Sequence, residues 1–123
     1  MTVLVDAPRR AESDLHAWTR ACRLDKLVPG RGVAVLLPRA EQVALFLLQD
    51  GTLRGVGNVD PFGRAAVMSR GITGDRRGEP TVASPLLKQV FSLIDGRCLD
   101  DESHALPVYE VRVVDGVVEI KNP

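Results

Sequence analysis

Residues 42–56 read Gln-Val-Ala-Leu-Phe-Leu-Leu-Gln-Asp-Gly-Thr-Leu-Arg-Gly-Val, two mostly apolar runs joined by one Asp-Gly pair at positions 50 and 51. A two-residue hairpin turn needs positive φ at its centre, and Asp-Gly adopts that backbone at little cost. We therefore predict that residues 43–49 pair with residues 52–56 as an antiparallel hairpin. This stretch sets the fold class.

The same pattern continues along the chain. Residues 108–114 and 117–121 flank another such pair, Asp115-Gly116. Short runs bounded by turn residues are typical of β-strands. The sequence thus predicts an all-β fold, an antiparallel β-barrel or sandwich of eight or more short strands with little helix. The other expected elements are strands at 18–23, 33–37 and 42–48 and one helical turn at 65–68.

The bulk composition argues against two classes of function. The chain has 123 residues, of which 45% are hydrophobic and 26% are charged, as in an ordinary globular domain. Its 16 basic and 16 acidic residues cancel, so it lacks the cationic surplus of nucleic-acid-binding proteins. No apolar stretch approaches the roughly 20 residues of a membrane-spanning helix. We expect a flexible N-terminal arm at 1–13 and a single domain at 14–123.

Cysteine usage and the first residues indicate the compartment. Cys22 and Cys98 stand far apart and form no Cys-x-x-Cys pair, whereas a small secreted domain usually carries more cysteines. The first residues do not show a basic segment followed by a long apolar run, as a secretory signal would. Both observations favour a cytoplasmic protein.

Two segments in the middle of the chain carry the most specific pattern. Residues 58–62 read Asn-Val-Asp-Pro-Phe, and residues 83–91 read Ala-Ser-Pro-Leu-Leu-Lys-Gln-Val-Phe, followed by Asp95-Gly96. They resemble the two cluster-binding loops of a Rieske domain, with their Cys-Pro-His and Cys-Pro-x-His-Gly motifs. The matching positions are Pro61, Pro85, Phe91 and Gly96, and the four ligand positions are occupied instead by Asp60, Phe62, Ser84 and Leu87.

This combination is similar to the small subunit of bacterial assimilatory NAD(P)H-dependent nitrite reductase. The resemblance implies a Rieske-like fold in which a small loop-rich lobe replaces the cluster-binding subdomain. It also implies a cofactor-free accessory subunit without catalytic residues of its own. Its partner would be a large subunit carrying FAD, sirohaem and a [4Fe–4S] cluster, which reduces nitrite to ammonia in nitrate assimilation.

The chemistry of the four ligand positions supports the loss of the cluster. A Rieske centre takes two thiolates and two imidazoles. Phe62 and Leu87 have no donor atom, while Asp60 and Ser84 offer oxygen, which suits hard cations better than an iron–sulfide core. We expect Asp60 and Ser84 to hydrogen-bond across the gap, and Phe62 and Leu87 to fill the space of the cluster. A hard cation bound by the two oxygens is the alternative.

Other candidate sites have simpler explanations. His16 and Cys22, like Cys98 and His104, are six residues apart, about 20 Å along an extended strand and too far for one metal ion. A four-ligand site formed by both pairs stays open, although a buried thiol is the expected state of Cys22. Residues 71–75 lack the Gly-Lys ending of a phosphate loop, so we expect a β-turn there. We expect residues 100–102, Asp-Asp-Glu, to form a solvated loop.

The cations in or beside the two loops are the candidate partner contacts. Arginine is enriched at protein interfaces because its planar fork binds carboxylates through two hydrogen bonds. Solvated surface is the alternative for these side chains. Two other functions also stay open, an electron carrier of the Rieske ferredoxin type and a free-standing β-barrel interaction module. The candidate cations are Arg64, Arg70, Arg76, Arg77 and Lys88.

Overall fold

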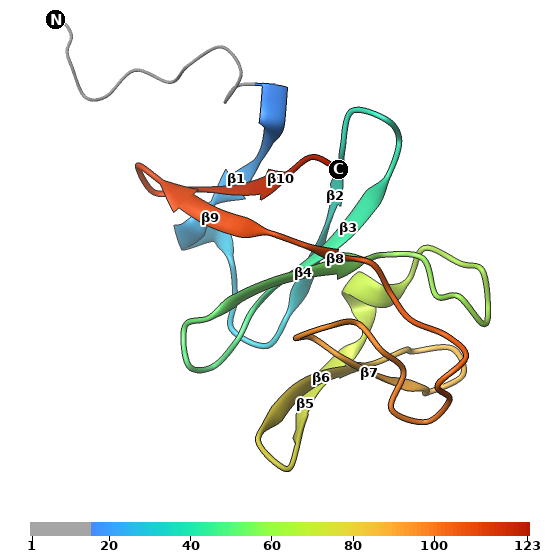
Figure 1. The fold of residues 1–123 in the computed structure, drawn as a ribbon. Helices are drawn as coiled ribbons and strands as arrows, with labels where there is room; N and C mark the ends of the chain where they lie inside the picture. The colour runs from blue at the N-terminus through green and yellow to red at the C-terminus, as the bar shows by residue number, and fades with distance from the viewer. Residues whose placement is uncertain (1–15) are drawn as a thin grey trace, which may run out of the picture.

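The computed structural model describes residues 16–123 and is all-β, with three antiparallel sheets and two single-turn 3₁₀ helices in the described part (Figure 1). The predicted arm at 1–13 lies outside the described residues. No helix within 16–123 is long and apolar enough to cross a membrane. The predicted all-β class is therefore confirmed, as a sandwich-like stack of sheets.

The central sheet contains the hairpin predicted at residues 43–56. Gly51 has φ 90°, and the Thr52 N–H donates to Asp50 Oδ1 at 2.9 Å, so the chain turns at Asp50-Gly51. The predicted two-residue turn is wrong, because the Leu48 N–H donates to the Thr52 carbonyl and Gln49 therefore also belongs to the loop. The hairpin is confirmed. In spatial order the strands are β2 (Gly32–Leu36), β3 (Gln42–Leu47), β4 (Leu53–Gly57) and β8 (Val108–Tyr109).

The second sheet joins the two ends of the described chain. Asp115 and Gly116 have φ 51° and 77°, so the second Asp-Gly turn is confirmed. The predicted single strand at 108–114 is wrong, however, because the segment divides at Glu110 and its first part pairs with β4. In spatial order the strands are β1 (Trp18–Arg23), β10 (Val117–Lys121) and β9 (Val111–Val114).

The third sheet supports the loop-rich lobe and corrects two predictions. Residues 71–75 form most of a strand rather than a β-turn, since the turn comes later at Arg77-Gly78, with φ 55° and 87°. The helical turn expected at 65–68 lies at η2 (Met68–Arg70) instead, because Ala66 pairs with Val59 in a β-bridge. The strands are β5 (Ile72–Arg76), β6 (Glu79–Ala83) and β7 (Val90–Ser92), and the other 3₁₀ turn is η1 (Leu24–Lys26).

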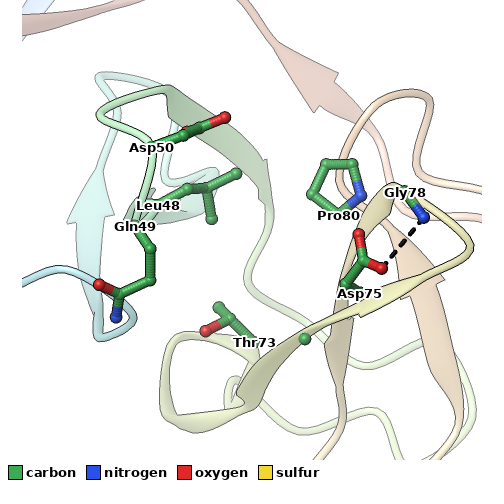
Figure 2. Close-up of a pocket in the computed structure, with 8 residues that line it drawn as sticks. Leu48, Gln49, Asp50, Thr73, Asp75, Gly78 and Pro80 are labelled. Atoms are coloured by element: carbon green, nitrogen blue, oxygen red, sulfur yellow. Dashed lines mark hydrogen bonds between the residues drawn. The ribbon is translucent and has the colours of Figure 1, made fainter.

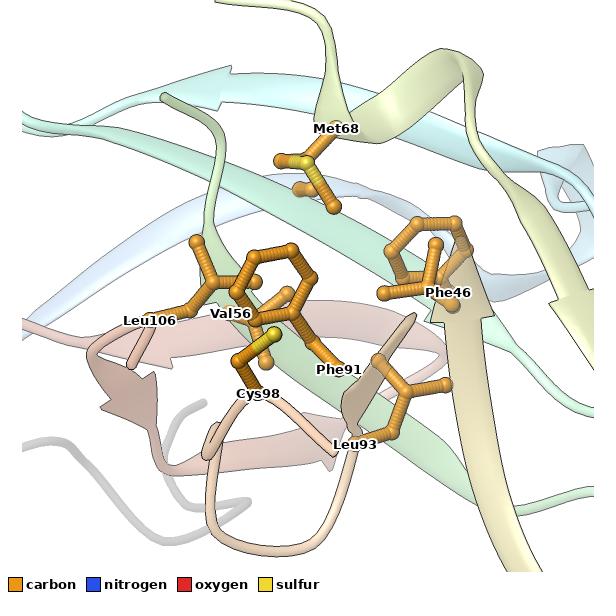
Figure 3. Close-up of a cluster of buried hydrophobic side chains, with 9 residues drawn as sticks. Phe46, Val56, Met68, Phe91, Leu93, Cys98 and Leu106 are labelled. Atoms are coloured by element: carbon orange, nitrogen blue, oxygen red, sulfur yellow. The ribbon is translucent and has the colours of Figure 1, made fainter. Parts of the chain in front are cut away.

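Strand β3 lies between two hydrophobic cores, which explains why residues 43–47 are all apolar. Val43 and Leu45 face the core shared with β10, whereas Ala44 and Phe46 face the core shared with the lobe. All four side chains are fully buried, so both faces of this strand must be apolar. Figure 3 shows the lobe core, whose members include Phe46, Val56, Met68, Phe91, Leu93, Cys98 and Leu106.

Glu79 ties the lobe strands together and makes the stability depend on pH. Its carboxylate accepts hydrogen bonds from the Ser92 hydroxyl at 2.5 Å and from Arg97 at 2.9 Å. These two bonds, the one from Ser92 foremost, hold the pKa of Glu79 below its ordinary value of 4.5. A lowered pKa in the folded state stabilises the protein above the unfolded-state value, and this contribution is lost as the pH falls through the folded-state pKa.

We therefore expect the free energy of unfolding to fall as the pH drops below about 4.5, and Glu79→Gln to make that fall shallower. Urea unfolding followed at a series of acidic pH values measures both slopes. Glu102→Gln, on an exposed loop, is the matched control and should leave the slope unchanged. Equal slopes for wild type and Glu79→Gln would contradict the assignment.

Candidate functional site

The two loops that match the Rieske motifs share one backbone plan, displaced by 24 residues. In each loop the carbonyl of the first residue accepts the N–H of the residue four positions later. These bonds run from Arg64 to Asp60 at 2.7 Å and from Lys88 to Ser84 at 3.1 Å. Arg64 and Lys88 both have left-handed backbones, with φ 56° and 62°. The loops are therefore ordered turns of one type.

Asp60 and Ser84, the first residues of these loops, join them by a buried hydrogen bond. The Ser84 hydroxyl donates to Asp60 Oδ2, and the two residues are 1% and 0% exposed. Asp60 Oδ1 accepts the N–H of Phe62 at 2.8 Å, and Ser84 Oγ accepts the N–H of Leu86 at 3.3 Å. The hydrogen bond predicted between the loops is confirmed, and we call this pair the latch.

Phe62 and Leu87, the apolar residues at two of the four ligand positions, differ in burial. Phe62 is half-buried and stacks on His104 with ring centroids 4.1 Å apart, as expected for a side chain that fills the space. Leu87 is 55% exposed, so the prediction that it fills the same space is wrong. The turn closed by Ser84 and Lys88 places Leu87 at its outer side. Leu86 instead lies against Gly63, where an added Cβ would come within 2.9 Å of its Cδ1.

These residues do not fit a [2Fe–2S] cluster. Phe62 and Leu87 offer no lone pair, and both oxygens of Asp60 already accept protein hydrogen bonds. A cation between Asp60 and Ser84 would have to displace the hydroxyl hydrogen that joins them. Within residues 16–123 there is also no group of three or more His, Cys, Asp and Glu side chains that could hold a metal ion. The side chains at these four positions therefore do not provide the ligand set of such a cluster.

The other thiols and imidazoles are explained by packing. Cys98 is buried in the lobe core beside Phe91 (Figure 3). Cys22 is half-buried rather than buried as predicted, and the partial loss of solvent raises the pKa of its thiol. His104 stacks on Phe62 and contacts the Ser103 hydroxyl through Nδ1 at 2.8 Å. The four-ligand site left open by the sequence does not form.

Asn58 closes the base of the first loop, a role that motif reasoning missed. This buried side chain donates to Gln42 Oε1 at 3.1 Å and accepts the N–H of Ser69 at 2.8 Å. It thereby ties the start of the loop both to its end and to β3. The only signal in the sequence is an asparagine directly after a strand, and its two partners lie 16 and 11 residues away in the chain.

The structure separates the five candidate cations. Arg64 and Lys88 lie at corresponding positions of the two loops. Arg70 ends η2 and borders a separate groove opposite Arg31. The remaining two lie on the β5–β6 hairpin, where Arg76 pairs with Asp100 at 3.5 Å and Arg77 occupies the turn. The loops thus bring together two of the five candidates, and a partner contact at any of them stays a prediction.

A further groove lies between the β3–β4 and β5–β6 hairpins (Figure 2). Two acidic side chains line it, but each already closes a turn. Asp75 accepts the N–H of Gly78 at 3.0 Å, and Asp50 accepts that of Thr52 at 2.9 Å. Hydrogen bonds from Thr52, the one from its side chain foremost and the one from its N–H second, hold the pKa of Asp50 below its ordinary value. These carboxylates therefore have a structural role, and the groove carries no assigned ligand.

The sheet order and the paired loops define a class of protein. A family model described as a Rieske-like [2Fe-2S] domain matches residues 17–121, and the chain belongs to this class. Within it, the chain belongs to the nitrite reductase small subunits. It is 43% identical over 108 residues to the nitrite reductase (NADH) small subunit of Salmonella typhimurium, covering 87% of this chain and 99% of that protein.

Two further relatives extend the comparison. The crystal structure of a nitrite reductase small subunit from Mycobacterium tuberculosis, described as NADH-dependent, superimposes with a TM-score of 0.84 at 57% identity. That match covers 86% of this chain and 95% of the other. A nitrite reductase [NAD(P)H] large subunit of Klebsiella oxytoca contains a segment 38% identical over 105 residues, or 85% of this chain and 11% of that protein.

Proposed function

We propose that this chain is the cofactor-free accessory subunit of an NAD(P)H-dependent nitrite reductase, which reduces nitrite to ammonia in nitrate assimilation. The observation that carries the proposal is the latch between Asp60 and Ser84. It occupies two of the four ligand positions with a protein hydrogen bond, and Phe62 and Leu87 at the other two have no donor. The redox chemistry must then reside in a partner.

The partner is the large subunit, in which we place FAD, sirohaem and the [4Fe–4S] cluster. The Klebsiella oxytoca relative supports this partnership, because a segment similar to this chain forms 11% of a protein named as a large subunit. When two protein modules form one polypeptide in one organism, the corresponding separate chains of another organism are good candidates for association. We also place the complex in the cytoplasm, where its nicotinamide substrate is available.

Co-expression with the large subunit tests the proposal. We expect the two chains to purify together, and nitrite-dependent NAD(P)H oxidation to be higher or longer-lived with this chain than without it. If the large subunit alone has the same activity and the same half-life, the accessory role is wrong. If the two chains migrate separately, the protein is instead a free-standing interaction module.

A further inference from the structure

We propose that the ends of the two loops form the docking surface for the large subunit, with exposed Leu86 and Leu87 at its centre and Arg64 and Lys88 beside them. We call these four residues the loop tip. The matching patch on the large subunit is apolar with carboxylates at its edge. This inference rests on the proposed function and adds to it the surface and the chemistry of its contact.

The first observation is apolar exposure. Leu86 and Leu87 are consecutive and 47% and 55% exposed, at the end of a loop whose base is buried. Single exposed apolar side chains are ordinary, whereas adjoining ones next to charges are typical of interaction sites. Leu86 reaches across to Gly63, so both loops contribute to one continuous surface.

The second observation is the backbone of the two cations. Arg64 and Lys88 are held at φ 56° and 62°, a left-handed backbone that is disfavoured for a residue with a Cβ but not for glycine. Neither forms an ion pair with any of residues 16–123. A strained backbone that carries an unpaired charge at an exposed turn indicates a side chain kept for contact.

The third observation is rigidity. The latch and the repeated backbone bonds fix both loops from inside, and Phe62 packs on His104 at their side. A surface that is already ordered loses less conformational entropy on association. The loop tip is therefore preorganised for docking.

Charge decides the chemistry of the partner patch. Arg64 and Lys88 favour carboxylates, whereas Asp101 of the loop that carries His104 presents the opposite sign along the neighbouring edge. Hydrogen bonds from Ser103 hold the pKa of Asp101 low, so this edge stays anionic at neutral pH. Opposite charges on two edges favour a single docking orientation.

Binding of the purified large subunit to single-site variants of the full chain tests the proposal. We expect Leu87→Asp to raise the Kd about tenfold or more, and Lys88→Glu to raise it about tenfold and weaken its salt dependence. Two exposed residues elsewhere provide matched controls. Leu36→Asp controls for the leucine, since Leu36 is 66% exposed, and Lys26→Glu controls for the cation, since Lys26 is an exposed lysine in η1 and is not a candidate partner contact.

The outcomes separate this inference from the proposed function. If wild type binds and the loop-tip variants bind equally well, the docking surface is wrong while the accessory role stands. If the controls weaken binding as much as the loop-tip variants do, the surface is also wrong. If wild type does not bind the large subunit, the accessory role itself fails. Thermal melting of each variant verifies that it is folded.

Lys88→Gly separates docking from stability. Glycine relieves the left-handed backbone but gives more freedom to the unfolded chain, so we expect a small net rise in melting temperature of about 2 °C. Binding to the large subunit should weaken in the same variant, because the cation is gone. A variant that is less stable, or that binds as tightly as wild type, would contradict a contact role for Lys88.

Discussion

Asp60→Ala is expected to lower the free energy of unfolding by about 3 kcal/mol, because it leaves the buried Ser84 hydroxyl and the Phe62 N–H without their acceptor. The latch occupies two positions that hold cluster ligands in a Rieske domain. We therefore expect it to hold the two loops together, as the cluster does there. Urea unfolding followed by circular dichroism measures the loss. Asp75→Ala is the control, since Asp75 accepts one hydrogen bond on an exposed turn and should cost below about 1 kcal/mol.

A double-mutant cycle sharpens this prediction. If Asp60 and Ser84 act as one unit, the variant with both changed to alanine should be more stable than the sum of the single losses implies. Additive losses would show that each residue acts through other contacts. A loss for Asp60→Ala no larger than that of Asp75→Ala would contradict the latch.

Gly96→Ala is expected to be the other severe substitution, costing about 3 kcal/mol or more. An added Cβ at Gly96 would lie 2.0 Å from the carbonyl oxygen of Leu106, and the backbone has φ 81°. The backbone strain and the steric clash therefore both destabilise the Gly96→Ala variant. Gly78→Ala separates them, because Gly78 has φ 87° with no atom within 4 Å of the added Cβ, and strain alone should cost about 1 kcal/mol.

Thermal melting of the two glycine variants beside wild type is sufficient to compare them. The close approach at Gly96 holds the segment after β7 against Leu106 of the lobe core, where the Leu106 N–H donates to the Gly96 carbonyl at 2.7 Å. Equal melting temperatures for Gly96→Ala and Gly78→Ala would show that the segment moves aside and that its packing is not needed for the lobe.

The local signals in the sequence predicted much of the fold. Both hairpins predicted from Asp-Gly pairs are present, but only Asp115-Gly116 forms the expected two-residue turn, since the loop at Asp50-Gly51 also includes Gln49. The strand at 72–76 was missed because its turn, Arg77-Gly78, places an arginine where asparagine or aspartate is usual. The division at Glu110 was missed because pairing of β8 with β4 is a tertiary choice that periodicity does not encode.

The candidate site could also be predicted only in part, because some of its contacts depend on tertiary structure. The hydrogen bond between Asp60 and Ser84 could be predicted because the resemblance to a Rieske domain places these two polar residues on facing loops, and it forms. The outward position of Leu87 depends on how the turn closes at Lys88, whose positive φ has no signal in the sequence. The stacking of His104 on Phe62 joins residues far apart in the chain, which a single sequence does not bring together.

We expect the isolated chain to fold without binding a [2Fe–2S] cluster. Electron paramagnetic resonance of the anaerobically purified and reduced chain, after incubation with iron and sulfide, tests it most directly. We expect no Rieske-type signal, from a chain that melts at the same temperature before and after the incubation. A Rieske-type signal in proportion to protein would contradict it and make the chain an electron carrier.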